Sequence, residues 1–238
     1  MLNQNSLEEI AEIYNLLVDI KKEYEDGIKP ILIQNSPKFF SNPHSVPKLK
    51  KIQINRGLGL AAQNTNLLKK NIDEFERITG QKPIVTKSKK AIAGFKIREE
   101  MELGLSITLR GEKMYQFLTK LLFFTFTQIR DFGGLSLRSF DKAGNYTLGL
   151  KEQLIFPEVD YDQVEQVQGF TINLILEHGS PKYRSDSIDK ILNGMILFKF
   201  LRFPLNDSGY YEKYESFTDI NRTWDKKRHL KRKRWSQE

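Results

Sequence analysis

The 238-residue chain contains no cysteine and only three histidines, and these absences exclude several kinds of site. Without thiols the chain can form neither structural disulfides nor thiolate metal centres. His44, His178 and His229 lie far apart in the sequence, which argues against a histidine-based metal site or a catalytic triad. No apolar run approaches the roughly 20 residues that a membrane-spanning helix needs. We therefore expect no cofactor, no metal and no membrane partner.

The first residues also lack the features of a targeting signal. Glu8, Glu9, Glu12 and Asp19 fall in the first predicted helix. Transit peptides are poor in acidic residues, and secretory signals need an apolar core after a basic start. The expectation is a protein that works in the compartment where it is made.

Positive charge is concentrated at the end of the chain. The net charge is +8, but the segment from 226 to 238 accounts for most of it, leaving 31 bases and 29 acids upstream. A tail of this kind is a solvated extension, a targeting signal, or an arm that becomes ordered on RNA. Its cations are Lys226, Lys227, Arg228, Lys231, Arg232, Lys233 and Arg234.

Alternating and helical patterns together indicate an α+β fold. Period-two alternation predicts strands near 49–55, 103–110, 146–150 and 170–176, and a short strand is also predicted over 83–86. Helical spacing predicts helices over 7–21, 67–79 and 111–122 and from about 185. Each strand has one apolar and one polar side, whereas a sheet covered on both faces would show continuous apolar runs. The prediction is a two-layer domain with a mostly antiparallel sheet, helices on one face and an open RNA-binding face.

Prolines divide the N-terminal part from the rest. Pro30, Pro37, Pro43 and Pro47 are expected to break the chain into an irregular connector, either a flexible linker or a loop laid on a partner. The predicted organisation is an N-terminal helix and connector over 1–48, an RNA-binding domain over 49–204, and a basic extension over 205–238.

The polar side of the predicted strands offers amides, hydroxyls and cations. Such groups can donate hydrogen bonds to phosphates and 2′-hydroxyls or read base edges, although an ordinary solvated face would look the same. Large aromatic residues are lacking there, so the face does not resemble a base-stacking sheet. The candidate residues are Lys51, Gln53, Asn55, Ser106, Thr108 and Arg110.

A basic, glycine-containing loop over 87–98 is the second candidate RNA contact. Five cations in an exposed loop suit a phosphate backbone. Ile92, Phe95 and Ile97 either stack on bases or fold back onto the core. The loop residues singled out are Lys87, Ser88, Lys89, Lys90, Gly94, Phe95, Lys96 and Arg98.

Two enzymatic readings have weaker support. Gly57, Gly59 and Ala62 have the spacing of a dinucleotide-binding turn, but the preceding strand alternates with polar residues and no ribose-binding acid follows. Glu158 with two nearby aspartates resembles an acid pair, yet its surroundings look like a turn without a histidine or cysteine partner. We expect no catalytic site.

Several short motifs resemble the L-five family of large-subunit ribosomal proteins, in family order from about Val46 to Leu176. They are Thr79-Gly80-Gln81-Lys82-Pro83, Ala91-x-Ala93-Gly94-Phe95-Lys96-Ile97-Arg98, Thr108-Leu109-Arg110-Gly111-Glu112, Ile129-Arg130-Asp131-Phe132, Ser139-Phe140-Asp141, Gly144-Asn145-Tyr146 and Glu152-Gln153-x-Ile155-Phe156-Pro157-Glu158. Together these motifs are specific, although each alone would be weak.

The resemblance implies particular roles for these residues. Asn55, Gln81 and Thr108 match the family's 5S rRNA contacts on an exposed sheet face, and the 87–98 loop matches its loop facing peptidyl-site tRNA. Arg56 stands where the family usually has methionine, and we expect it to add a phosphate contact.

The resemblance also implies partners and a compartment. It implies a structural role in the central protuberance, with contacts to large-subunit rRNA, neighbouring large-subunit proteins and, across an intersubunit bridge, a small-subunit head protein. The sequence of residues 88–95 is most similar to that of plastid members of the family. This similarity implies an organelle-encoded protein of the chloroplast ribosome, and the alternative localisation is a bacterial cytoplasm. An RNA-binding regulator outside the ribosome remains the alternative function.

Overall fold

The structure, a computed structural model, describes residues 20–35, 42–59, 64–159, 161, 164, 166–178 and 187–206. Most of the first predicted helix and the whole basic tail therefore lie outside the described residues. Among the described segments, none of the helices combines the length and apolar character needed to cross a bilayer.

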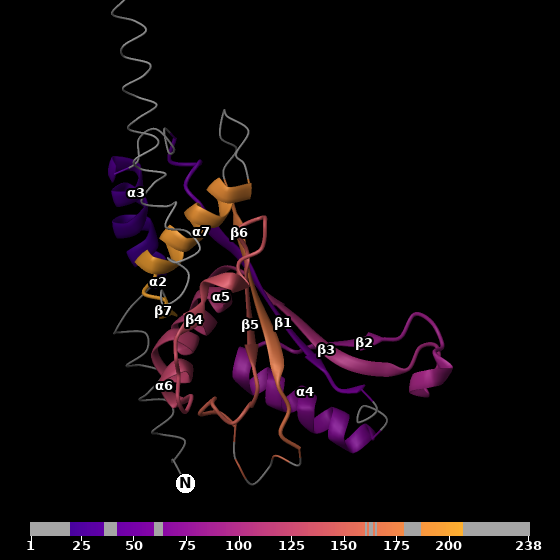
Figure 1. Ribbon diagram of the computed structural model, residues 1–238. Helices are drawn as coiled ribbons and strands as arrows, with labels where there is room; N and C mark the ends of the chain where they lie inside the picture. Colours follow the sequence, from indigo (N-terminus) through magenta and orange to yellow (C-terminus); the bar gives the residue numbers. More distant parts are fainter. Residues whose placement is uncertain are drawn as a thin grey trace, which may run out of the picture.

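A five-stranded antiparallel sheet forms the centre of the molecule (Figure 1). Its strand order is β2-β3-β1-β6-β5, so the first strand lies in the middle. The bounds are β1 Lys48–Gly57, β2 Ile84–Lys87, β3 Glu102–Leu109, β5 Tyr146–Leu150 and β6 Phe170–Glu177. A second, parallel pair joins β4 (Leu135–Ser136) to β7 (Leu205–Asn206).

Helical segments precede the sheet and separate most of its strands along the chain. They are α2 Ile20–Lys22, a π-helix Glu23–Ile28, α3 Lys29–Asn35, α4 Thr65–Thr79, a 3-10 turn Ala93–Phe95, α5 Gly111–Lys120, a π-helix Leu121–Thr125, α6 Phe126–Gln128, a 3-10 turn Leu137–Ser139 and α7 Ser187–Phe200. The predicted α+β class is confirmed.

Aromatic contacts show that the helices cover one face of the sheet. The Phe75 ring of α4 lies 5.6 Å from the Phe170 ring of β6, and the Phe198 ring of α7 lies 5.4 Å from the Tyr146 ring of β5. Side chains of α5 join the same buried cluster, with Leu118 fully buried. Since successive strand residues point to opposite faces, the other side of the sheet carries the polar alternates.

The expectation that an irregular connector begins at Pro30 is wrong. A helical run continues from Ile20 to Asn35, and Pro30 sits near the start of α3. The preceding π-helical turn places the Lys29 N–H on the carbonyl of Tyr24, five residues back. Such a widened turn accommodates a proline ring that would otherwise clash with the preceding turn.

This N-terminal helical run packs against the main core. Tyr24 is buried and donates through its hydroxyl to the Pro47 carbonyl at 2.9 Å, and Arg202 forms an ion pair with Glu23 at 2.7 Å. Residues Ile28 and Leu32 are buried in the same cluster. The division of the chain at 48/49 stays a prediction.

The turn before β5 accounts for two of the family-like motifs. Asp141 accepts hydrogen bonds from the backbone N–H groups of Ala143 and Asn145 at 2.9 and 2.7 Å. The Asn145 side chain accepts from the Leu176 N–H at 3.0 Å, which fixes the turn to β6. These motif residues therefore have a scaffolding role.

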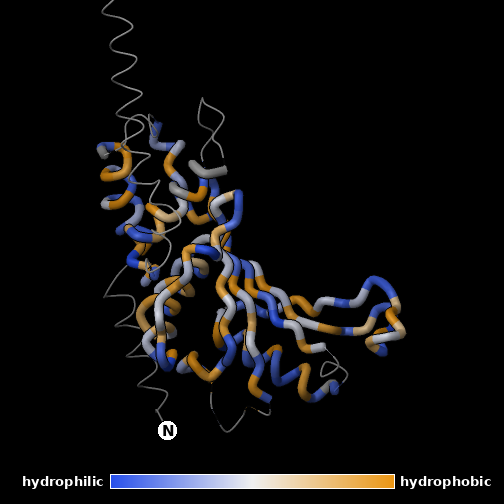
Figure 2. Tube along the Cα trace, viewed as in Figure 1, coloured by the Kyte–Doolittle hydropathy of each residue, from blue (hydrophilic) through white to orange (hydrophobic). Residues whose placement is uncertain are grey.

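The hairpin of β2 and β3 projects from the rest of the molecule as an arm (Figure 1). Figure 2 shows that the far end of this arm carries both hydrophilic and hydrophobic segments. The arm contains the whole 87–98 loop that the sequence singled out.

Candidate nucleic-acid interface

Strand register arranges the polar side of the sheet into rows that cross it. In the first row Ile84, Ser106, Asn55, Thr171 and Gly149 lie side by side on β2, β3, β1, β6 and β5. Asn55 and Gly149 are exposed, and Ile84 keeps 71% of its surface accessible. Ser106 and Thr171 are half-buried, so a ligand can reach the row at both ends and at its centre.

The second row is polar throughout. It runs from Thr108 on β3 through Gln53 on β1 and Asn173 on β6 to Thr147 on β5. Gln81 adds to its β3 end, because its Nε2 donates to the Thr108 carbonyl at 3.4 Å. The structure thus brings the predicted residues Gln53, Gln81 and Thr108 together, beside the row that holds Asn55 and Ser106.

The loop after α4 positions Gln81. Gly80 has φ +67°, a left-handed conformation that glycine adopts without strain and that ends the helix. The Thr79 hydroxyl donates to the Phe75 carbonyl at 2.7 Å and accepts from the Gln81 N–H at 3.3 Å. Lys113 donates to the Gly80 carbonyl at 2.8 Å, so the turn is held from both sides.

Acidic groups on this face lie at its ends, opposite lysines. Glu177 forms ion pairs with Lys48 and Lys50 at 3.4 and 3.3 Å, and the two ammonium groups lower the pKa of its carboxyl. Alternation puts Glu102 on the same side as Ser106, and its register partner is Lys87. Unpaired negative charge would repel a polyanion, and the described strands place none in the middle of the face.

Cations border the rows. Lys51 is half-buried on β1 opposite Ile175, and Arg110 is exposed directly after β3. Both follow the alternation that places Gln53 and Thr108 on the open face. They can supply charge to a phosphate backbone while the rows supply neutral donors and acceptors.

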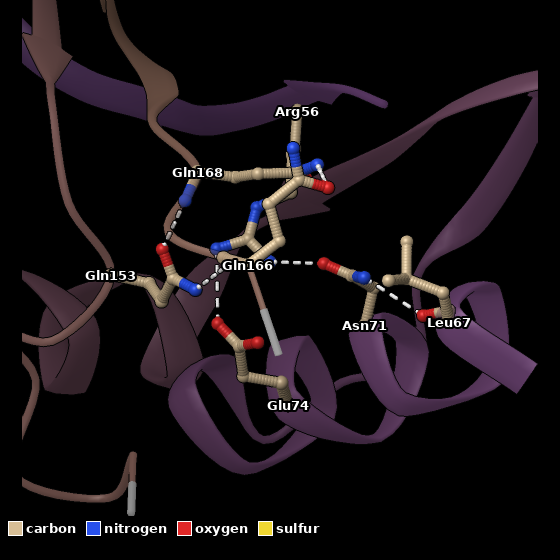
Figure 3. A network of polar contacts seen from close by, with 7 residues as sticks. All are labelled: Arg56, Leu67, Asn71, Glu74, Gln153, Gln166 and Gln168. Atoms are coloured by element: carbon tan, nitrogen blue, oxygen red, sulfur yellow. Dashed lines mark hydrogen bonds and ion pairs between the residues drawn. The ribbon is translucent and has the colours of Figure 1, made fainter. Parts of the chain in front are cut away.

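Arg56 does not reach this surface, which corrects the expected phosphate contact. Its side chain is fully buried and donates to Asn71 Oδ1 at 2.7 Å and to Glu74 Oε1 at 3.0 Å (Figure 3). The guanidinium lies 4.3 Å from the centre of the Phe75 ring and 5.5 Å from that of Phe170. Alternation along β1 explains this position, since Arg56 shares the inner side with Ile52 and Ile54.

The arm presents its cations to solvent. Lys87, Lys89, Lys90, Lys96 and Arg98 are all exposed, whereas Ser88 is half-buried and donates to the Lys90 carbonyl at 2.7 Å. A bridge between Ile92 and Ile97 closes the tip, and a Cβ added at Gly94 would meet nothing within 4 Å. Phe95 keeps 68% of its surface exposed and Ile92 47%, so neither folds back onto the core.

The enzymatic readings find no support in the described residues. β1 runs antiparallel to both neighbours, unlike the parallel strand before a dinucleotide-binding turn, and Ala62 lies outside the described residues. Glu158 pairs with Lys120, while Asp160 and Asp162 lie outside the described residues. Within the described ranges no group of three or more His, Asp or Glu side chains could hold a metal ion.

Three polar residues that were not among the candidates predicted from the sequence complete the rows. Thr171 and Asn173 alternate with the buried residues of β6, and Thr147 alternates with those of β5. The period-two pattern of these strands carries that signal. Their alignment with Asn55 and Gln53 depends on strand order and register, which the pattern does not contain. The seven cations of the basic tail lie outside the described residues.

Comparisons with known proteins agree on one family. A model described as the C-terminus of the ribosomal L5 family matches residues 102–204, and one described as ribosomal protein L5 matches 42–98. Over the full length of both chains, the sequence is 86% identical to large ribosomal subunit protein uL5c of Phaeodactylum tricornutum and 73% identical to that of Thalassiosira pseudonana. It is 51% identical to large ribosomal subunit protein uL5 of Rippkaea orientalis over 66% of this chain and 86% of that one.

Proposed function

This chain belongs to the ribosomal protein L5 family, a family of non-enzymatic structural proteins, and from that premise we propose that it binds 5S rRNA in the large subunit of the chloroplast ribosome. The observation that carries the proposal is the open face, where Asn55, Gln81 and Thr108 lie together on adjoining rows. No described helix covers the polar sides of β1, β3 and β6.

The proposed mechanism is architectural. Cations such as Lys51 and Arg110 provide affinity that depends on salt, because binding releases counterions from phosphates. Asn55, Gln53 and Ser106 fix the register of the RNA through hydrogen bonds to 2′-hydroxyls and base edges. A rigid antiparallel sheet holds these groups at fixed spacings, so the ordering cost is met during folding and not on binding.

Filter binding with 5S rRNA tests the proposal. Asn55→Ala, Gln81→Ala and Thr108→Val should each weaken binding by about 1–3 kcal/mol, the cost of leaving a buried polar partner unsatisfied. Gln116→Ala, which changes an exposed glutamine of α5, is the matched control. Wild-type affinity in all three face variants would overturn the assignment.

We propose that the arm contacts peptidyl-site tRNA. Its exposed cations suit a phosphate backbone, and the uncovered Phe95 ring suits stacking on a base. Replacing Lys89, Lys90 and Lys96 by glutamine should leave 5S rRNA affinity unchanged and lower tRNA occupancy of the peptidyl site in assembled ribosomes. Loss of 5S rRNA affinity instead would move the arm into the primary contact.

We extend the family's other contacts to this chain as proposals. They are large-subunit rRNA, neighbouring large-subunit proteins and a small-subunit head protein across an intersubunit bridge. We also propose an organelle-encoded gene and the division into 1–48, 49–204 and 205–238. Sedimentation of the native protein with the large subunit supports a ribosomal role, whereas a free pool bound to other RNA would favour a regulator. Sequencing plastid DNA tests the gene's location, and limited proteolysis tests the boundaries.

A further inference from the structure

The β6 and β5 side of the open face carries hydrogen-bonding groups that the structure leaves available. Asn173 and Thr171 are half-buried and Thr147 is exposed. Within the part of the chain that the structure describes, no side-chain hydrogen bond occupies any of the three. A carboxamide on a sheet face can serve as both donor and acceptor, so Asn173 suits the same ligand groups as Asn55.

These residues continue the rows of the proposed 5S rRNA site without interruption. Asn173 is the register partner of Gln53, and Thr171 is the register partner of Asn55. Thr147 in turn stands opposite Asn173. Strands are about 4.8 Å apart, so β5 lies roughly 14 Å from β3, three strands away.

The electrostatics and shape of this half also suit RNA. The described residues place no carboxylate between Asn55 and Thr147, and the acid at the end of β6, Glu177, is paired with two lysines. Gly149 on β5 is exposed, and a Cβ added there would meet nothing within 4 Å. A ligand lying along the first row can therefore approach the backbone of the edge strand.

We propose that the RNA-binding surface extends across β6 and β5, where Thr147, Thr171 and Asn173 contact 5S rRNA nucleotides separate from those at Asn55, Gln81 and Thr108. The inference rests on the proposed function. Successive nucleotides of a duplex strand advance by roughly 3.4 Å, so a displacement of about 14 Å corresponds to about four nucleotides. The site is thus a band crossing the sheet and not a patch at β1 and β3.

The test uses the full chain with a 5S rRNA transcript. Asn173→Ala removes a donor and acceptor, and Gly149→Tyr adds bulk to the face at a position with free space, using a residue that favours strands. Asn66→Ala, at an exposed asparagine of α4, and Gly133→Tyr, at an exposed glycine with equally free space, are the matched controls. Circular dichroism establishes that each variant is folded.

Both face variants should weaken 5S rRNA binding about fivefold or more, and both controls should bind as the wild type does. Hydroxyl-radical footprints should show Gly149→Tyr losing protection about three nucleotides from the position that Asn55→Ala exposes, because β5 and β1 are two strands, roughly 10 Å, apart. If folded Asn173→Ala and Gly149→Tyr bound 5S rRNA with wild-type affinity and footprints while Asn55→Ala was impaired, this extension would be overturned and the proposed function would stand. Failure of the wild-type chain to bind 5S rRNA would overturn the proposed function and this extension together.

Discussion

The buried Arg56 provides a sharp test of how charge is accommodated beneath the open face. Its guanidinium is held by Asn71 and Glu74 and lies against the Phe75 and Phe170 rings. The Glu74 side chain keeps 16% of its surface exposed, so the anion retains access to water while the cation has none. Burial accordingly lowers the pKa of the Arg56 guanidinium, and the hydrogen bond and charge of Glu74 oppose that shift.

This asymmetry predicts unequal costs for removing the two partners. Glu74→Ala leaves a buried cation with one amide oxygen and two ring faces, and breaking a buried pair in this way costs about 3–5 kcal/mol. Cation–π attraction offsets roughly 1 kcal/mol, which gives an expected loss of about 2–4 kcal/mol. Arg56→Met removes the buried charge and keeps the volume, so its cost should stay below about 1.5 kcal/mol.

Urea denaturation followed by circular dichroism measures these differences in unfolding free energy. Glu76→Ala, which removes an exposed glutamate from the same helix, is the matched control. The double variant Arg56→Met/Glu74→Ala should be more stable than Glu74→Ala alone, since no unpaired cation remains. A loss in Glu74→Ala no larger than in Glu76→Ala would refute the reasoning, as would a double variant less stable than either single change.

Further predictions concern stability at other positions and the tail. Burial lowers the pKa of His178 below its usual 6.5, so neutral His178 is favoured in the folded protein. The free energy of unfolding should therefore be highest above about pH 6.5 and should fall as the pH drops toward the lowered pKa. His178→Asn should reduce this difference between urea titrations at about pH 7.5 and 5.5. Gly144→Ala should lower the melting temperature by several degrees, because φ is +80° and a Cβ would lie 2.5 Å from the Lys190 carbonyl oxygen; an unchanged melting temperature would contradict this geometry. Gln153→Ala should cost about 1–3 kcal/mol, since this fully buried side chain makes two hydrogen bonds to the loop before β6, and proteolysis of that loop should become faster. Deleting 226–238 should reduce the salt dependence of rRNA binding by about 0.7–0.9 log units per lost phosphate contact, and an unchanged slope would show that the tail binds elsewhere.

Local sequence patterns predicted the strands and helices better than they predicted which segments pack or pair with one another. The alternation of 103–110 and 170–176 identified β3 and β6 and the polar side of each strand, because one side packs against helices. Applied to β1, the same rule puts Arg56 on the inner side with Ile52 and Ile54, which the predicted phosphate contact did not take into account. Its charge favoured a surface position, and the nearby Glu74 and Phe75 stabilise the buried guanidinium in a way that the strand sequence alone does not reveal.

Features that depend on distant segments could not be predicted. Pro30 was expected to begin an irregular connector, yet a widened turn before it and the packing of Tyr24 near Pro47 keep the run helical. The rows that join Asn55 to Thr171 need the pairing of β1 with β6, whose residues are more than a hundred positions apart. The motif at Gln81 was recognisable, but its hydrogen bond to β3 follows from the left-handed turn at Gly80.

The central position of β1 also determines when the sheet can form during translation. Lys48 pairs with Glu177, which is made 129 residues later, and at roughly 5–20 residues per second this interval lasts about 6–26 s. During that time β1 has at most its β3 partner, and the half of the sheet formed by β6 and β5 does not exist. A nascent chain therefore cannot present the complete band to RNA until β6 has emerged. Strand order in this way delays completion of the proposed RNA-binding band until almost the entire described domain has been translated.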